Sequence, residues 1–243
     1  MTVEQQLDVI AVGAHPDDVE IGCGGTVASL VDRGYRVGIV DLTDGEPTPL
    51  SPHPDVRRAE ARRAAETLGV HYRHILDFPN RRLFDTFEAR VALAVEFRRW
   101  RPTLVLALGS RTPLASPDHW QARLIIEAAV FYSRLTKWDD QFAGLPPHAI
   151  EHLAYYPLGF DSVALDLPGH RWVQDISGSL DRKMAAIRCY ETQFPPAKTG
   201  LLSKIEHAAR FIGLSAGFEA GEQIVSPRVP ATDDLLAALA RKK

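Results

Sequence analysis

The chain has 243 residues, of which 45% are hydrophobic and 24% are charged, which is an ordinary composition for one globular domain with a full core. The formal net charge of −3 excludes the large basic surface on which nucleic-acid binding depends. The sequence has no run of roughly 18 apolar residues, and it begins with a polar segment, so we expect neither a membrane span nor a signal peptide. We therefore expect a cytoplasmic protein with no membrane or nucleic-acid partner.

Apolar runs and helical periodicity alternate along the first half of the chain. Strands are expected at residues 7–13, 35–42 and 103–109, and helices at 25–32, 56–68 and 84–100. Strands that alternate with helices form mostly parallel sheets covered on both faces. The fold class predicted is α/β, a Rossmann-like, mostly parallel sheet flanked by helices.

The second half continues with helices expected at 118–135, 178–193 and 201–212. Residues 139–177 are richer in Pro, Gly and aromatic residues, and two antiparallel strands are expected near 150–156 and 172–176. We interpret this segment as a cap that faces the substrate or a partner subunit. Residues 225–243 are expected to form a small C-terminal extension, with a tail helix at 233–240, so that 1–243 is a single domain.

The segment after the first strand, from Ala14 to Gly22, carries the first chemical signal. It contains His15, Pro16, Asp17 and Asp18 at the carboxyl end of a strand, where open parallel sheets place their ligands. Pro16 stiffens the turn, so that His15 and Asp18 can converge on one ion while Asp17 points elsewhere. Taken alone, the segment is equally consistent with a hydrogen-bonded turn that caps the next helix.

A second cluster, Ser116-Pro117-Asp118-His119, follows the strand expected at 103–109. The carboxyl ends of neighbouring parallel strands lie side by side, so His119 can reach an ion held by His15 and Asp18. An isolated histidine at a helix start is more often solvated, but two Pro-Asp clusters at two strand ends favour a shared site. Imidazole and carboxylate ligands suit a zinc ion with an open coordination position, and the sequence predicts such a site.

The glycine-rich segment Gly22-Cys23-Gly24-Gly25 suggests a rival, dinucleotide binding, with Asp41 at the end of the second strand. However, residues 15–21 separate these glycines from the first strand and add three carboxylates, which would repel a pyrophosphate. We therefore interpret the glycines as allowing a close approach between the first helix and the sheet.

Three segments, Ala14–Gly22, Asp41–Glu46 and Pro117–His119, together resemble the zinc-dependent N-acetylglucosamine deacetylases of the PIG-L or LmbE-like type. Residues 174–177, Lys183 and 190–193 extend this resemblance over nearly the whole chain. The form of the first segment is most similar to the deacetylases of bacillithiol biosynthesis, which remove acetate from a glucosaminyl malate. The resemblance implies a hydrolase that acts on a small-molecule amino-sugar conjugate and assembles as a homo-oligomer.

Residue by residue, the resemblance implies that His15, Asp18 and His119 bind Zn2+, or another divalent ion such as Fe2+. It implies that Asp17 is the general base for a zinc-bound hydroxide. Four residues are candidates for substrate binding, and each has a structural alternative: Arg57 as a solvated helix charge, Glu46 as a solvated loop residue, Asp118 as a helix cap and Tyr190 as core packing.

One position departs from the family pattern, because Ser116 stands where relatives usually have a histidine that assists catalysis. We expect Ser116 to stabilise the oxyanion directly or through water, aided by a histidine such as His53 or His152. The same departure keeps two alternatives open. The protein is either a deacetylase or amidase for another N-acetylglucosamine conjugate, or a zinc-containing sugar-binding protein with little turnover.

Overall fold

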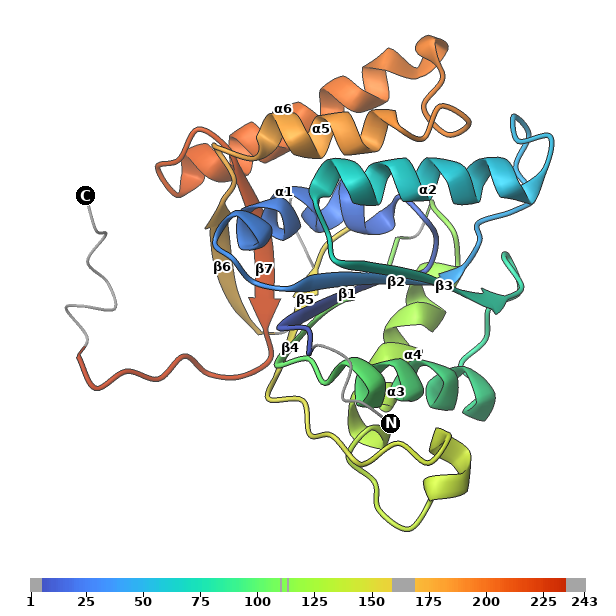
Figure 1. The fold of residues 1–243 in the computed structure, drawn as a ribbon. Coiled ribbons are helices and arrows are strands. Elements are labelled where there is room, and N and C mark those ends of the chain that lie inside the picture. Colours follow the sequence, from blue (N-terminus) through green and yellow to red (C-terminus); the bar gives the residue numbers. More distant parts are fainter. Residues whose placement is uncertain (1–5, 110, 113, 159–168, 235–243) are drawn as a thin grey trace.

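The computed structural model describes residues 6–109, 111–112, 114–158 and 169–234, which form one seven-stranded sheet covered by helices (Figure 1). The strand order is β3-β2-β1-β4-β5-β7-β6. The strands are β1 (Val9–Gly13), β2 (Val37–Thr43), β3 (Tyr72–Phe78), β4 (Leu104–Leu108), β5 (His152–Tyr156), β6 (His170–Asp175) and β7 (Gly221–Ser226). The helices are α1 (Asp18–Asp32), α2 (Pro54–Leu68), α3 (Phe87–Trp100), α4 (Asp118–Tyr132), α5 (Leu180–Arg188) and α6 (Thr199–Ser215), with short 3-10 turns η1 (Asp139–Phe142) and η2 (Pro196–Lys198).

Helices cover both faces of the sheet. In Figure 1, α1 and α2 lie on one face and α3 and α4 on the other. Helix α5 packs on α1 and α2, and α6 packs on α5, β6 and β7. Because both faces are covered, strands β1 and β2 are buried along their whole length, which is why they appear in the sequence as nearly continuous apolar runs. The predicted α/β class is confirmed.

The neighbouring strands β1 and β4 position the candidate site. They pair in parallel, with Val9 opposite Leu104 and Val12 opposite Ala107. Their carboxyl ends therefore open at the same edge of the sheet. The loop after β1 leads into α1, and the loop after β4 leads into α4, so that the two predicted clusters meet at this edge.

The predicted strands at 7–13, 35–42 and 103–109 are confirmed as β1, β2 and β4. The first helix begins at Asp18 rather than at residue 25, because the acidic segment already forms a helical turn before the glycines. Strands β3 and β7 were not predicted. Both strands mix polar with apolar residues, so neither appears in the sequence as an apolar run. The β3 side chains are mostly half-exposed at an edge of the sheet, and β7 contains Glu222, whose carboxylate is buried in an ion pair.

The predicted antiparallel pair at 150–156 and 172–176 is wrong in its pairing. Both segments are strands, β5 and β6, but β7 lies between them and runs antiparallel to each, while β5 pairs in parallel with β4. Both strands therefore belong to the main sheet. The tail helix expected at 233–240 lies almost entirely outside the described residues. Among the helices described, none has the length and apolar character needed to cross a membrane.

Candidate metal centre

Three predicted ligands converge at the carboxyl ends of β1 and β4. His15 follows β1, Asp18 begins α1 and His119 lies in the first turn of α4; all three are buried, and one ligand atom from each lies within 4.8 Å of the others. Nε2 of His119 is 3.4 Å from Oδ1 of Asp18, and Nδ1 of His15 is 3.4 Å from Oδ2. Two imidazole nitrogens and one carboxylate are donors that suit a catalytic Zn2+ or a similar borderline ion, so the cluster fits such a metal.

The Asp18 carboxylate is held in place by its own loop. Its Oδ2 atom accepts hydrogen bonds from the backbone N–H groups of Ala14 and His15, both at 2.9 Å. Burial acts to raise the pKa of Asp18, but the neighbouring imidazoles of His119 and His15 outweigh it and hold this pKa well below its usual range. Asp18 is therefore an anionic candidate ligand whose orientation is fixed by its own loop.

Each imidazole has a polar partner on its other nitrogen. Nε2 of His15 lies 3.3 Å from Oδ2 of Asp118, and Nδ1 of His119 lies 2.7 Å from Oγ1 of Thr112. Such partners fix the ring orientation of metal-binding histidines. Burial acts to lower the pKa of His15, but hydrogen bonds to Asp118 and Asp18 raise it to about 10 in the absence of an ion.

Asp17 directly precedes the predicted ligand Asp18 in the chain but is not one of the three residues whose ligand atoms converge. Its φ of 115° is rare for a residue with a side chain. The backbone is therefore strained at the residue directly before α1 begins at Asp18. One carboxylate oxygen of Asp17 contacts Nη2 of Arg57 at 3.1 Å. Burial raises the pKa of Asp17 and Arg57 lowers it, while the charge of Asp18 raises it again, with a result of about 7. A carboxyl group with this pKa can exchange a proton at neutral pH.

Arg57 is only 3% exposed, so its interpretation as a solvated helix charge is wrong. Its Nη2 atom donates to the carbonyl of Pro16 at 2.5 Å, in addition to the contact with Asp17. The Nε and Nη1 atoms have no hydrogen-bond partner among the described residues. Arg57 therefore holds the backbone just before Asp17 and the Asp17 carboxylate, while two of its nitrogen atoms have no partner among the described residues.

Asp118 does not cap α4. The cap position is occupied by Pro117, and the Asp118 carboxylate instead contacts His15 and accepts a hydrogen bond from the backbone of Arg81 at 2.6 Å. The Oγ atom of Ser116 accepts from the backbone N–H of Asp118 at 3.3 Å. Ser116 therefore supports the start of α4, and its own hydroxyl proton is not used in that bond.

The other predicted substrate-binding residues have internal partners. Tyr190 is fully buried, and its hydroxyl donates to Glu20 at 2.7 Å, a geometry that favours core packing. Glu46 is also buried, and its carboxylate accepts from the backbone and the hydroxyl of Thr48, so it is not a solvated loop residue.

Neither histidine proposed to assist Ser116 joins the cluster. His53 is exposed, and its ring caps α2 by accepting from the backbone of Asp55. His152 begins β5 opposite Leu104 at the start of β4, so it lies at the edge of the sheet opposite the metal ligands. The prediction that His152 assists catalysis is therefore wrong.

A buried ionic network beneath the first turn of α1 was not predicted. Arg73 of β3 contacts Glu20 of α1 at 2.5 Å and Asp41 of β2 at 2.8 Å. These side chains are at most 8% exposed. The network ties the turn that carries Asp18 to two neighbouring strands, and it was missed because β3 itself was missed.

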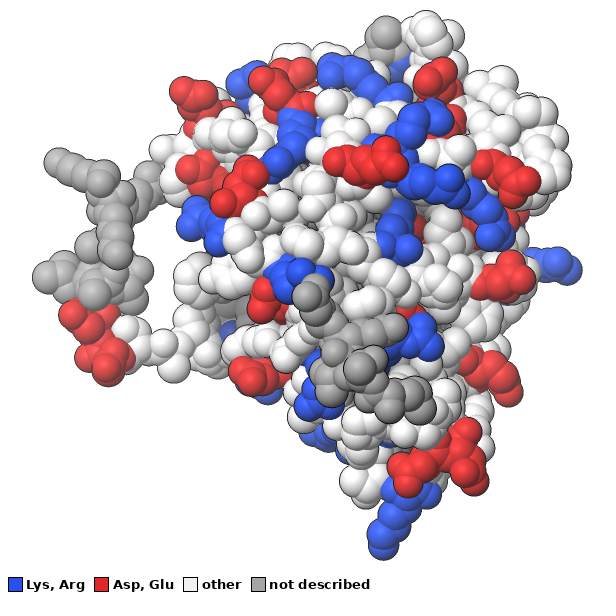
Figure 2. Space-filling model, in the orientation of Figure 1, with Lys and Arg blue, Asp and Glu red and all other residues white. Residues whose placement is uncertain are grey.

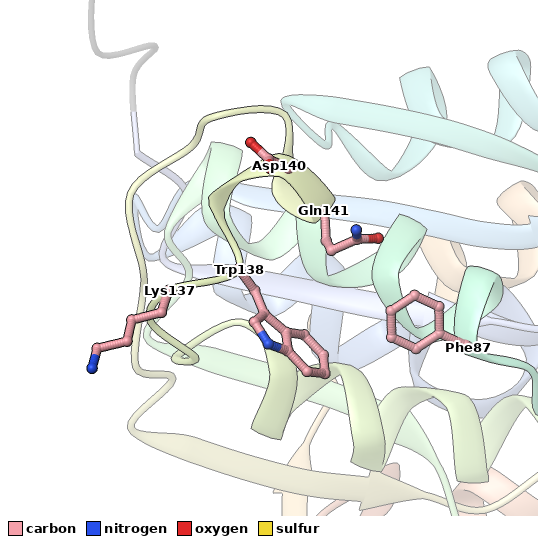
Figure 3. A pocket seen from close by; sticks show the side chains of 5 residues that line it. All are labelled: Phe87, Lys137, Trp138, Asp140 and Gln141. Carbon is pink, nitrogen blue, oxygen red and sulfur yellow. The ribbon is translucent and has the colours of Figure 1, made fainter.

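Among the described residues, His15, Asp18 and His119 form the one group of three or more His, Cys, Asp or Glu side chains close enough to hold an ion. A hollow on the α3 side is lined by Phe87, Lys137, Trp138, Asp140 and Gln141, and none of these five residues belongs to the metal cluster (Figure 3). On the face drawn in Figure 2, positive and negative side chains are interspersed.

The fold and the cluster together define an α/β protein with a candidate His-Asp-His metal centre at the carboxyl edge of its sheet. Residues 10–130 match the family model described as PIG-L: GlcNAc-PI de-N-acetylase, and the chain belongs to this family. It is 34% identical to the diacetylchitobiose deacetylase of Thermococcus kodakarensis over 199 residues, which cover 77% of this chain and 70% of the relative.

Two further comparisons extend the similarity along the chain. The crystal structure of a conserved protein from Thermus thermophilus superimposes with a TM-score of 0.80 and 32% identity, over 97% of this chain and 100% of that one. A 4-oxalmesaconate hydratase from Pseudomonas putida is 28% identical over 92% of this chain and 91% of its own length. Proteins similar to this chain therefore carry the names of more than one reaction.

Proposed function

We propose that this protein is a metal-dependent N-deacetylase that removes the acetyl group from an N-acetylglucosamine conjugate. The observation that carries the proposal is the convergence of His15, Asp18 and His119 within 4.8 Å, with Asp17 beside them. Membership of the PIG-L family and the similarity to a diacetylchitobiose deacetylase support the same reaction. Zn2+ is the first candidate ion and Fe2+ the second.

The chemistry divides among a few groups. A bound Zn2+ supplies a Lewis acid for the acetamide carbonyl and lowers the pKa of a coordinated water to about 7. Asp17 accepts the proton from the attacking water as the oxygen–carbon bond forms. It then returns this proton to the nitrogen as the carbon–nitrogen bond breaks, which yields a free amine and acetic acid, and the acid loses its remaining proton to solvent to become acetate. In the metal-free chain, burial raises the pKa of Asp17 to about 7, so the carboxyl group can both accept and donate a proton near neutral pH.

Arg57 holds this base in position. It contacts the Asp17 carboxylate and the carbonyl of Pro16, so both the side chain and the backbone of the strained turn are tied to α2. Its two unpaired nitrogens also make Arg57 the strongest of the four substrate-binding candidates. Asp118 and Tyr190 are engaged within the protein, and Glu46 is bound to Thr48.

We assign to Ser116 a share in stabilising the oxyanion that develops on the acetamide carbonyl, beside the positive charge that a bound ion would supply. The Ser116 oxygen accepts from the Asp118 backbone, which leaves its hydroxyl proton available to donate. A serine provides a neutral donor where relatives usually have an imidazole. The expected rate is therefore lower than with histidine, and this favours a second candidate, a zinc-containing sugar-binding protein with little turnover.

The first substrate candidate is a glucosaminyl malate conjugate of the type used in bacillithiol biosynthesis. The alternatives are chitin-derived N-acetylated disaccharides and acetylated sugars of antibiotic pathways. Because one relative is named a 4-oxalmesaconate hydratase, the unsaturated tricarboxylic acid 4-oxalmesaconate belongs in the same panel, as the substrate of a contrasting reaction.

The test is acetate release from this panel by protein loaded with Zn2+ or Fe2+, compared with the Asp17→Asn variant. Release that depends on the ion and is lost in Asp17→Asn, with metal content retained, supports the deacetylase. Sugar binding without acetate release supports the binding protein, and turnover of the unsaturated acid alone overturns the deacetylase proposal.

A further inference from the structure

Helix α1 is interrupted one turn after the metal ligand that begins it. Cys23 has φ −144° and ψ 21°, outside the helical region, although the residues on both sides are helical. A short first segment therefore carries Asp18 and Glu20, and a longer second segment continues to Asp32. The break separates the part of the helix at the metal centre from the part that packs along the sheet.

A buried ion pair occupies the break. In a continuous α-helix, the carbonyl of Ile21 would accept from the N–H of Gly25, four residues later. Here Nζ of Lys183, on α5, donates to the Ile21 carbonyl at 2.7 Å, and Oε1 of Glu222, on β7, accepts from the Gly25 N–H at 3.0 Å. Lys183 and Glu222 contact each other at 2.5 Å, so the pair bridges the two groups that the break separates.

Further contacts make this a specific arrangement. Oε2 of Glu222 accepts from both the backbone N–H and the hydroxyl of Thr26, each at 2.6 Å. The side chains of Lys183 and Glu222 are each only 3% exposed, so water does not replace a lost partner easily. Gly25 also permits a close approach, since a Cβ atom there would lie 2.6 Å from the side chain of Ile176.

We propose that Lys183 and Glu222 are positioning residues for the metal centre. They form hydrogen bonds with the Ile21 carbonyl and the Gly25 N–H, the two backbone groups that the break leaves without each other. The first turn of α1 is thereby held in an orientation that differs from that of the second segment, in which the Asp18 carboxylate faces His15 and His119. The second helix segment remains free to follow the sheet. This inference rests on the metal centre of the proposed function, but it does not depend on which substrate is used.

The test is Co2+ binding to the purified, metal-free full chain. Titration gives the dissociation constant of Co2+, and the visible absorption spectrum of the bound ion reports its ligand geometry. We expect Glu222→Gln and Lys183→Met to weaken Co2+ binding by about 10-fold or more, within the range found for residues that orient metal ligands. We also expect both variants to change the spectrum, because the ligand geometry is altered.

Glu96→Gln is the matched control, because Glu96 is a buried carboxylate of α3 that binds Tyr72, Arg99 and Trp100 and touches no residue of the metal centre. It is expected to lower the melting temperature while Co2+ affinity and spectrum stay unchanged. An unchanged affinity and spectrum in folded Glu222→Gln, or an equal loss in Glu96→Gln, overturns the proposal.

If Glu222→Gln does not fold, Thr26→Val decides the question. It removes one hydrogen bond to Glu222 and retains the ion pair, so a weaker Co2+ complex is expected, and an unchanged complex overturns the proposal. All these measurements are made without substrate. A protein that binds Co2+ as expected but releases no acetate therefore contradicts the proposed function and not this inference.

Discussion

Oδ2 of Asp118 lies 3.3 Å from Nε2 of His15, although the two residues are 103 positions apart in the chain. This contact leaves Nδ1 of the same imidazole to face Asp18. Asp118 thus contacts one candidate metal ligand, His15, from the first turn of α4, which also carries another, His119. The carboxylate of the second motif therefore contacts the candidate site through His15 of the first motif.

Asp118→Ala is expected to weaken Zn2+ binding by about 10- to 100-fold, because the His15 ring loses the partner that fixes its orientation. Asp118→Asn retains an acceptor for the ring N–H and is expected to have a smaller effect. Competition with a chromophoric chelator measures both dissociation constants. Equal affinities for the wild type and Asp118→Ala would show that the contact does not orient the ligand.

Arg57→Leu is expected to move the acidic limb of the pH profile of kcat/KM to higher pH. The positive charge of Arg57 lowers the pKa of Asp17, so its removal raises the pH above which the base is ionised. A neighbouring opposite charge typically changes a carboxyl pKa by roughly one to three units. Arg57→Lys retains the charge and serves as the control, with a smaller displacement, and an acidic limb that stays in place in Arg57→Leu contradicts the assignment.

Metal binding is expected to release at least about one proton per ion at pH 8.5. The pKa of His15 is raised to about 10 without an ion, so this imidazole is protonated at pH 8.5 and must lose its proton to become a ligand. Titration calorimetry in buffers with different ionisation enthalpies counts the protons. Heats that do not depend on the buffer would contradict the predicted protonation state.

The same pKa has a consequence for the metal-free protein. Because the folded-state pKa of His15 lies above its ordinary value of 6.5, the stabilisation from its protonated form is fully present below pH 6.5 and is lost as pH rises toward 10. Chemical denaturation of the metal-free chain across this range is expected to show that loss. In Asp118→Ala the loss is expected to be smaller, because one of the contacts that raise this pKa is gone.

Ser116→Ala is expected to lower kcat with little change in KM, by no more than the roughly 100- to 1000-fold lost when a stronger oxyanion donor is removed. Ser116→His is expected to preserve or raise kcat, because an imidazole provides a better donor. Ser116 also supports the start of α4, so the melting temperature of each variant is measured as the control. The free energy of unfolding is expected to fall by about 1 kcal/mol in Ser116→Ala, because this variant loses the hydrogen bond to the Asp118 backbone. Unchanged turnover in Ser116→Ala would remove Ser116 from the catalytic groups.

The convergence of His15, Asp18 and His119 could be predicted, because two polar motifs follow two apolar strands and parallel strands open at a common edge. The alternation of apolar and helical segments likewise predicted the central strands. These features are local in sequence, or they follow from one rule of sheet construction. Sequence reasoning is therefore most informative about the ligands and the strands that carry them.

The supporting residues could not be predicted in the same way. Arg73 reaches Glu20 and Asp41 only because the strand order places β3 next to β2 and β2 next to β1. The pair of Lys183 and Glu222 requires α5 and β7 to pack against the break in α1. Contacts of this kind depend on the relative position of elements far apart in the chain, and a pattern of apolar residues does not specify them.

The ligand atoms belong to two stretches of chain that only the finished sheet brings together. A cation bound there would link the segments that follow β1 and β4. It would stabilise the folded chain, because the unfolded chain does not bring these ligand atoms together. At a free concentration 1,000 times its dissociation constant, such an ion adds about 4 kcal/mol to the free energy of unfolding. If the site binds such an ion, the melting temperature of the protein is expected to rise with the free metal concentration.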